Sequence, residues 1–325
     1  MYMKNSASKF HEIINRSIKS IGLKSNPKKL YEPIKYILNL KSKRVRPILT
    51  LMSYSLFNKN IEEAVKPAIA IEFFHNFTLI HDDIMDSAEI RRGEKTIHNK
   101  WNNNTGILSG DLLMIFAYKM LESISNNNMS LILKKFNSIS IKVCEGQQFD
   151  MDYESQESVR EADYLEMIKL KTAVLLGFSL ELGGIIGGCD NNISNQLYKI
   201  GENMGVGFQL KDDYLDVFGN KNFGKKIGGD ILNNKNTYLI IKLKEKANKV
   251  DLEKINFWLK NKNEPNKKIS EITKLMFKYK IDKIAEDKIK SYFEDGIKTL
   301  KSLKEDGLNT EALINYFDYM MNRKK

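Results

Sequence analysis

The chain has 325 residues, of which 42% are hydrophobic and 29% are charged, and it contains 19 glycines and 5 prolines. This composition excludes disordered, collagen-like and low-complexity proteins, and the small number of helix breakers favours α-helices. The formal net charge of +11 suggests an anionic partner: a nucleic acid, an anionic membrane surface or a phosphorylated small molecule.

Apolar residues recur at helical spacing along the whole chain. In chain order, apolar runs that predict helices occupy residues 31–38, 45–52, 61–85, 107–124, 131–143, 164–186, 193–217, 269–276 and 281–292. Glycine and asparagine clusters separate them at residues 102–105, 126–128, 187–192 and 219–229. Alternating patterns typical of strands are nearly absent. We therefore predict an all-α protein with roughly ten or more helices, in a single domain that spans residues 1–325.

The same spacing of aspartates occurs twice, each time after an apolar segment. The first aspartate cluster, in LIHDDIMD, is Asp82, Asp83 and Asp86, and the second, in QLKDDYLD, is Asp212, Asp213 and Asp216. On a helix, positions i and i+4 share one face, and position i+1 is turned by about 100°. Grouped carboxylates repel one another unless a cation neutralises them. Mg²⁺ fits this role, because it prefers oxygen ligands and is typically held by one or two carboxylates and substrate phosphates.

Two other interpretations of the aspartates are weaker. They could belong to charged surface helices, but the apolar segments before both clusters indicate core helices. A calcium EF-hand is disfavoured, because neither cluster has the glycine and terminal glutamate of that loop. We therefore expect two magnesium-binding clusters.

Basic residues accompany both clusters. Arg91 and Arg92 precede Gly93, which predicts that they lie on a loop at the end of the helix. The other basic positions are Lys43 and Arg46, expected one helical turn apart in KSKRVRP; Lys171 with Thr172, expected to open a leucine-rich helix; and Lys225, Lys226 and Lys235 near Asp230 in FGKKIGGDILNNK. Arginine forks and glycine-rich backbone both bind phosphate. Together these residues indicate two anionic groups, one bridged to aspartates by Mg²⁺ and one held by cations alone.

Histidines near the first cluster have two interpretations. His75 and His81 are either core residues that bond a backbone carbonyl or contacts to phosphate. His98 and Trp101 are interpreted as structural.

Two cysteines, Cys144 and Cys189, are too few for a disulfide scaffold or a four-thiolate zinc site. They are typical of a reducing compartment. Residues 1–20 contain no apolar segment typical of a signal peptide. The stretch 172–188 is short for a membrane span and contains Glu181. We expect a cytoplasmic protein without an integral membrane segment.

These ordered motifs resemble the trans-isoprenyl diphosphate synthases of the polyprenyl synthetase family. The resemblance covers residues from about 41 to 242 and rests on HDDIMDSAEIRRGEKTIHNKW, GFQLKDDYLDVFG with GKKIGGDI, the segment KRVRP and the Lys171–Thr172 pair. Two departures are visible. Residues 234–239 read NKNTYL where the family often has Gly-Lys before Thr-Leu-Pro, and Lys225 and Lys226 are both candidates for one ligand.

The resemblance implies an antiparallel helix bundle around a deep central cavity, usually in a homodimer. It implies Mg²⁺, three ions per active site with substrate bound. The implied ligands are Asp82, Asp86 and Asp212, supported by Asp83, Asp213 and Asp216. The implied contacts of the allylic diphosphate are Arg91, Lys171, Thr172, Gln209 and either Lys225 or Lys226, and Lys235 is a further candidate for substrate binding. Those of isopentenyl diphosphate are Lys43, Arg46, His75 and Arg92.

The resemblance also implies a reaction. Isopentenyl diphosphate would condense head to tail with a C5 to C15 allylic diphosphate, and diphosphate would be released. The implied catalytic residues are Asp82, Asp83, Asp86, Arg91, Lys171 and Asp212.

Product length is expected to depend on the residues before the first cluster. Phe77 stands five positions before Asp82, Thr78 is not aromatic, and DDIMD has no insertion. This resembles the geranylgeranyl type, so we expect a C15 to C20 product, with C20 favoured. Alternatively, Phe77 packs between helices and another residue forms the floor.

Other functions stay open from the sequence. One is a longer-chain synthase that makes C30 or more. Another is a class I terpene cyclase, although such an enzyme would not need a second set of cations. A silent subunit of a heteromeric synthase would usually lack some aspartates, and none is missing here. A nucleic-acid-binding protein is disfavoured, because the ordered acidic clusters would repel phosphate.

Overall fold

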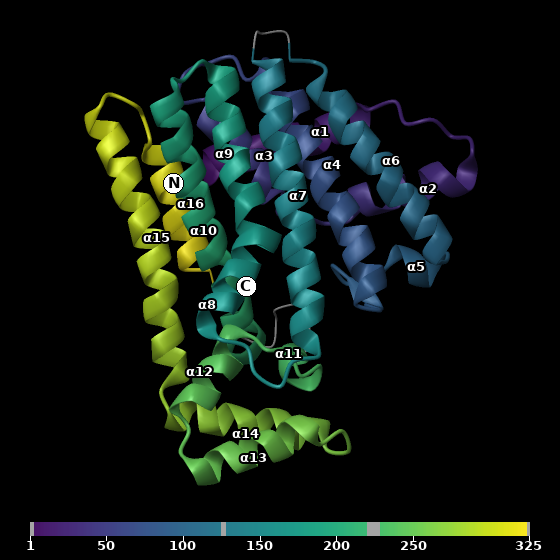
Figure 1. The fold of residues 1–325 in the computed structure, drawn as a ribbon. Helices are drawn as coiled ribbons and strands as arrows, with labels where there is room; N and C mark the ends of the chain where they lie inside the picture. The colour runs from purple at the N-terminus through teal and green to yellow at the C-terminus, as the bar shows by residue number, and fades with distance from the viewer. Residues whose placement is uncertain (1–2, 125–127, 220–227, 324–325) are drawn as a thin grey trace. The chain divides into compact units, whose positions relative to one another are not determined.

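The computed structural model describes residues 3–124, 128–219 and 228–323 (Figure 1). In these residues nearly all regular structure is helical, and the only strands are the two-residue β1 (Ile90–Arg91) and β2 (Glu94–Lys95), which pair antiparallel. The all-α prediction is therefore confirmed.

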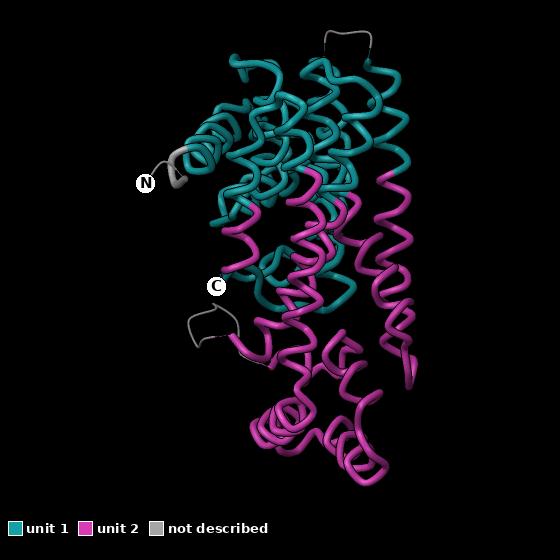
Figure 2. The backbone as a smooth tube through the Cα atoms, turned by 90° about the vertical axis from the view of Figure 1, so that its left-hand side faces the viewer, with its two compact units in different colours: residues 1–138, 175–201, 300–316 teal, residues 139–174, 202–299, 317–325 magenta. Residues whose placement is uncertain are grey.

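The chain divides into two compact units, which Figure 2 colours separately. Unit 1 comprises residues 1–138, 175–201 and 300–316, and unit 2 comprises residues 139–174, 202–299 and 317–325. The expected single domain and central cavity stay predictions.

The helices fall into three groups according to these units. Unit 1 alone contains α1 (Met3–Ser20), α2 (Lys28–Asn39), α3 (Val45–Tyr54), α4 (Glu62–Met85), α5 (Ile97–Lys100) and α6 (Asn103–Leu121), together with both strands. Unit 2 alone contains α8 (Glu161–Ile168), the π-helical turn η1 (Lys169–Ala173), α11 (Gly229–Leu232), α12 (Tyr238–Lys246), α13 (Lys249–Lys260) and α14 (Pro265–Lys278). Residues of both units occur in α7 (Met129–Glu154), α9 (Val174–Gly187), α10 (Asn191–Phe218), α15 (Ile281–Glu305) and α16 (Glu311–Met321).

Local sequence signals set several helix ends. The side chain of Asn102 accepts a hydrogen bond from the backbone N–H of Thr105, at 2.8 Å, and so caps α6. Asn248 caps α13 in the same way. Pro47 and Pro265 stand in the first turns of α3 and α14, where a missing N–H costs little.

Helix α4 lies at the centre of unit 1. It contacts α3 and α6, and most of its side chains are buried around its whole circumference. Phe74 packs against Phe136 of α7, with ring centroids 5.2 Å apart, and Phe136 lies 6.0 Å from Phe178 of α9. These three fully buried rings each contribute about 1.5–3 kcal/mol. They hold rigid the helix that carries the first aspartate cluster.

Among the described residues, one helical run is long and apolar enough to cross a membrane. It extends from Glu161 to Gly187 through α8, η1 and α9, and 89% of its most apolar window is buried inside the structure. That burial is typical of a core helix.

Helices α13 and α14 pack against each other in unit 2 (Figure 1). The buried Lys268 of α14 donates to the carbonyl oxygen of Leu259, at 2.9 Å, and to Oδ1 of Asn234, at 2.5 Å. Lys268 therefore fixes the segment between α11 and α12.

Candidate active site

The first aspartate cluster ends α4. Asp86 is the C-cap residue, and its N–H donates to the carbonyl oxygen of Asp82 at 2.8 Å. Asp86 is exposed, Asp82 is partly exposed and Asp83 is buried. The cluster thus presents two accessible carboxylates one helical turn apart and one inaccessible carboxylate.

A tight hairpin follows the cluster. Arg92 and Gly93 have φ of 56° and 82°, and this left-handed turn reverses the chain between β1 and β2. Nε of Arg91 then lies 2.8 Å from both carboxylate oxygens of Asp83, and its Nη2 lies 3.3 Å from Oδ2 of Asp82. The expected loop is thus a hairpin that returns Arg91 to the aspartates.

The pKa values of this pair show opposing effects. Burial raises the pKa of Asp83 above its ordinary value, although the bonds from Arg91 oppose the shift. Burial lowers the pKa of Arg91, but the bonds and charge of Asp83 outweigh it and leave that pKa raised. Arg91 is therefore the counterion of the inaccessible carboxylate.

A second group in unit 1, the cation cluster, consists of Arg46, His75 and Arg92. Nη1 of Arg46 lies 3.1 Å from Nε2 of His75. Burial, followed by the charges of Arg46 and Arg92, holds the pKa of His75 well below 6.5, so the imidazole is neutral and accepts from Arg46. Burial lowers the pKa of Arg92 to about 10, and its buried Nη1 has no hydrogen-bond partner among the described residues. These properties fit a site for an anion.

The helix predicted around Lys43 was wrong. We expected Lys43 and Arg46 one helical turn apart, but α3 begins at Val45, and Lys43 lies exposed on the preceding loop. Arg44, the N-cap, has φ of 47°, a left-handed conformation that interrupts the helix.

The second aspartate cluster lies near the end of α10. Asp213 is buried, where the hydroxyl of Tyr164 and, at 3.1 Å, Nε2 of Gln209 donate to its carboxylate. Burial and the charge of Asp230 hold the pKa of Asp213 well above its ordinary value. Asp216 is also buried and accepts from the N–H of Asp230 at 3.0 Å.

Asp212 is the accessible member of this cluster. Its side chain is 36% exposed and forms an ion pair with the buried Arg323. Both clusters thus contain accessible and inaccessible carboxylates.

Lys171 and Thr172 lie within the π-helical turn η1, inside a continuous helical run, and do not open a helix as expected. Nζ of Lys171 lies 2.6 Å from Oδ2 of Asp150, and Thr172 donates to Oε1 of Gln209 at 3.2 Å. Since Gln209 also bonds Asp213, Thr172 belongs to the hydrogen-bond network of Asp213 in unit 2, and Lys171 forms a separate ion pair with Asp150. A π-helical turn inside a helix is frequent at functional sites.

The remaining candidates have different outcomes. Nε2 of His81 lies 3.1 Å from the carbonyl oxygen of Ile107, but His81 is partly exposed and is not a core residue. Nζ of Lys235 lies 3.9 Å from Oε1 of Glu154. The ring of Trp101 packs edge-on against that of Tyr36, with the ring centroids 5.4 Å apart, which is consistent with a structural role. Lys225 and Lys226 lie outside the described residues.

Sequence reasoning missed several partners of the site residues. They are Arg44 and Glu72 in unit 1, and Asp150, Tyr164 and Arg323 in unit 2. Asp230 was noticed only as a neighbour of lysines. No local pattern marks Tyr164 or Arg323, because their partners lie 49 and 111 positions away.

The donor set suits a hard cation. In the described part of the chain, no three His, Cys, Asp or Glu side chains are close enough to enclose a metal. Accessible single carboxylates without a complete cage suit Mg²⁺, which takes further ligands from water and substrate phosphates. The residues therefore fit a metal that binds together with an anionic substrate.

Comparisons with known proteins agree on one family. The family model for polyprenyl synthetases matches residues 27–276. The geranylgeranyl pyrophosphate synthase of Geoglobus acetivorans is 35% identical over 315 residues, which cover 96% of both chains. The geranylgeranyl diphosphate synthase of Saccharolobus solfataricus is 35% identical over 97% of each chain. A crystal structure of a geranylgeranyl pyrophosphate synthase matches with a TM-score of 0.92 and 38% identity, covering 99% of this chain and 100% of that one.

Proposed function

The chain belongs to the polyprenyl synthetase family and is a prenyltransferase, and we propose that it condenses isopentenyl diphosphate head to tail with an allylic diphosphate. The observation that carries this proposal is the cation cluster of Arg46, His75 and Arg92, which accompanies the acidic end of α4 in unit 1. A two-substrate reaction needs two diphosphate sites: carboxylates that bind one diphosphate through a metal, and cations that bind the other without a metal. A single-substrate cyclase needs only the metal-binding carboxylates.

We assign the accessible carboxylates, Asp82, Asp86 and Asp212, as ligands of Mg²⁺. When bound, Mg²⁺ would neutralise the leaving diphosphate of the allylic substrate. Asp83, Asp213 and Asp216, which protein groups already hold, would keep their helices and neighbouring donors in place. Arg91 and Lys171 would contact the allylic diphosphate, and Lys43 with the cation cluster would hold isopentenyl diphosphate.

The reaction follows from these charges. The allylic C–O bond breaks, and its electron pair leaves with the diphosphate, which yields an allylic cation. The double bond of isopentenyl diphosphate attacks this cation and forms the new C–C bond. A proton is then lost to the departing diphosphate. Preorganised cations stabilise the leaving group, and aromatic side chains such as Phe77 exclude the water that would quench the cation.

We propose a C20 product, and the names of the relatives from Geoglobus acetivorans and Saccharolobus solfataricus support it. The ring of Phe77 lies on α4 between those of Phe74, at 5.6 Å, and His81, at 4.8 Å. Its partly buried position suits a floor above the buried Phe74.

We also propose a homodimer formed through α6. Three apolar side chains on this helix are exposed: Ile107 by 44%, Leu108 by 60% and Ile115 by 61%. Such a surface on one helix suits burial against a second copy.

Product analysis tests the reaction. Purified protein is incubated with Mg²⁺, labelled isopentenyl diphosphate and, in parallel, C5, C10 and C15 allylic diphosphates. We expect a C20 product that EDTA abolishes. Asp82→Ala should lower kcat by about three orders of magnitude or more. The matched control Asp306→Ala alters an exposed aspartate and should retain activity.

Other outcomes distinguish the alternatives. A product of C30 or more keeps the enzyme class but refutes the chain length. No elongation with any primer contradicts condensation, and release of a cyclic hydrocarbon from the allylic substrate alone would identify a cyclase.

A further inference from the structure

A buried ion pair lies beside the cation cluster, and the reaction as proposed gives it no role. Nη1 of Arg44 lies 2.5 Å from Oε1 of Glu72, and the two residues are 3% and 1% exposed. A buried pair contributes little net stability compared with apolar residues, but losing one partner is strongly destabilising. Net stability alone therefore does not explain why this ion pair is buried beside the cation cluster.

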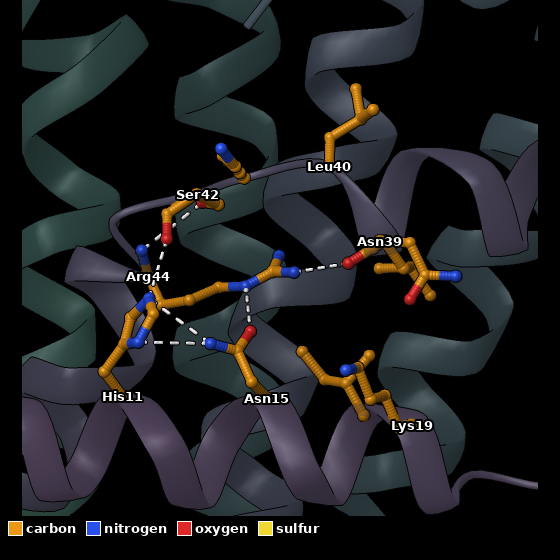
Figure 3. Close-up of a pocket in the computed structure, with 10 residues that line it drawn as sticks. His11, Asn15, Lys19, Asn39, Leu40, Ser42 and Arg44 are labelled. Carbon is orange, nitrogen blue, oxygen red and sulfur yellow. Dashed lines mark hydrogen bonds between the residues drawn. The ribbon is translucent and has the colours of Figure 1, made fainter.

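Arg44 joins three helices of unit 1. Besides Glu72 of α4, its guanidinium donates to the carbonyl oxygen of Leu38 in α2 and, at 3.2 Å, to Oδ1 of Asn15 in α1. His11 of α1 also lies 2.8 Å from the carbonyl oxygen of Ser42. Figure 3 shows His11 and Asn15 pointing toward Arg44, at a cavity of about 260 Å³. Arg44 and the bond between His11 and Ser42 thus attach the loop before α3 to helices α1 and α2.

Two candidate ligands of isopentenyl diphosphate flank Arg44, one on the loop and one at the start of α3. Lys43 immediately precedes Arg44, and Arg46 follows it in the first turn of α3. The backbone of Arg44 is left-handed, a conformation that a non-glycine residue keeps only when its surroundings hold it. The three contacts of the guanidinium, and the hydrogen bond between His11 and the carbonyl oxygen of Ser42, hold this conformation in place.

The charges of the pair reach two members of the cation cluster, His75 and Arg92. Glu72 stands three positions before His75 on α4, and Nδ2 of Asn76 donates to its Oε1 at 2.9 Å. The charge of Arg44 lowers the pKa of both His75 and Arg92, whereas the charge of Glu72 raises that of Arg92. Both members of the pair therefore act on the cation cluster.

Without Arg44, Glu72 would be a buried carboxylate beside cations that are meant for a diphosphate. It would attract Arg92 and Arg46 and repel the substrate, and these interactions are strong where water is excluded. Losing Arg44 would therefore change the charge of the neighbouring site as well as the stability of the fold.

We propose that Arg44 is a positioning residue for isopentenyl diphosphate: it neutralises Glu72 and fixes the loop that carries Lys43 and leads into the turn of α3 that carries Arg46. This inference rests on the proposed function, because it takes isopentenyl diphosphate as the anion of the cation cluster. Arg44 itself touches no substrate.

Four variants test the proposal: Arg44→Met, Glu72→Gln, the double variant Arg44→Met/Glu72→Gln, and Arg16→Met as a matched control at an exposed arginine of α1. KM is measured for each substrate separately. Binding of isopentenyl diphosphate alone is measured by calorimetry in EDTA, which needs no turnover. Circular dichroism and thermal unfolding report whether each variant folds.

Arg44→Met should raise KM and Kd for isopentenyl diphosphate about tenfold or more and KM for the allylic substrate less than about twofold. Glu72→Gln keeps an acceptor for Arg44 and should not raise either KM. The double variant removes the unpaired carboxylate and should recover about threefold or more of the loss. Arg16→Met should match the wild type.

A purely structural role predicts a different pattern. Both KM values would rise together, and the double variant would be no better than Arg44→Met; either result overturns the proposal. If Arg44→Met does not fold, a raised Kd in Glu72→Gln overturns it instead. A wild type that binds isopentenyl diphosphate but makes no product contradicts the proposed reaction and leaves the binding comparison intact.

Discussion

His75 is a neutral imidazole among arginines, and this fixes the sign of its effect on stability. Burial and the charges of Arg46 and Arg92 hold its pKa well below 6.5 in the folded chain. The unfolded chain takes up a proton near pH 6.5, whereas the folded chain does not, so acidification favours unfolding.

As the pH is lowered through about 6.5, we expect the free energy of unfolding of the wild type to decrease relative to that of the variant His75→Gln. The difference should grow by up to about 1.4 kcal/mol per pH unit. Urea denaturation at several pH values between about 5 and 8 measures it. Above about pH 7.5 the difference should be constant, because both states are neutral there. A difference that is constant at every pH would contradict the depressed pKa.

At the scale of elements, the π-helical turn depends on a glycine of another helix. A Cβ on Gly146 of α7 would lie 2.2 Å from the backbone nitrogen of Lys171 in η1, and a backbone atom cannot move aside as a side chain can. Alanine improves the helix propensity of α7 by about 1 kcal/mol. The clash costs more, because overpacking typically costs about 1–3 kcal/mol, occasionally more, and here it involves backbone.

We therefore expect Gly146→Ala to lose about 1–2 kcal/mol of stability, the cost of the clash less the gain in helix propensity, and to raise KM for the allylic substrate. Denaturation and steady-state kinetics measure the two effects. Gly22→Ala is the control, because nothing lies within 4 Å of a Cβ at Gly22. Unchanged stability in Gly146→Ala would mean that η1 does not pack closely against α7.

Helix α4 also provides the test of product length. Replacing Phe77 by alanine removes the ring above Phe74, so the product should lengthen beyond C20. Thr78→Phe should shorten it to C15, because an aromatic ring would occupy the next position of the helix. Chromatography of the products measures both.

Phe257→Ala, a change at an exposed ring of α13, is the control for product length and should leave it unchanged. An unaltered product from Phe77→Ala would assign the floor to another residue.

At the scale of the whole molecule, the exposed apolar residues of α6 predict association of two copies. The chain has a mass of 37.6 kDa, so light scattering of the wild type should report twice that value. Leu108→Glu places a charge in the proposed interface and should yield monomers, because burying an unpaired carboxylate costs several kcal/mol. Val250→Glu changes an equally exposed apolar residue of α13 and should remain dimeric. A monomeric wild type would refute the interface.

The sequence by itself determined the fold class and the family, and it located the two aspartate clusters. Helical periodicity is a local property, and the spacing of Asp82 and Asp86 places two carboxylates on one face wherever the helix lies. Asn102 and Pro47 could likewise be assigned to helix ends, because capping involves only neighbouring residues.

Only the tertiary structure decided which carboxylates are accessible. Asp83 and Asp213 occupy the same motif position, yet one is held by an arginine eight residues away and the other by Tyr164, 49 residues away. The partners of Arg44 were equally hidden, since Asn15 and Glu72 lie 29 and 28 positions from it. Spacing along a chain predicts contacts within one helix, whereas burial and ion pairing depend on which helices pack together. For this reason the sequence yielded the candidate residues of the site, and the fold determined how each one is held.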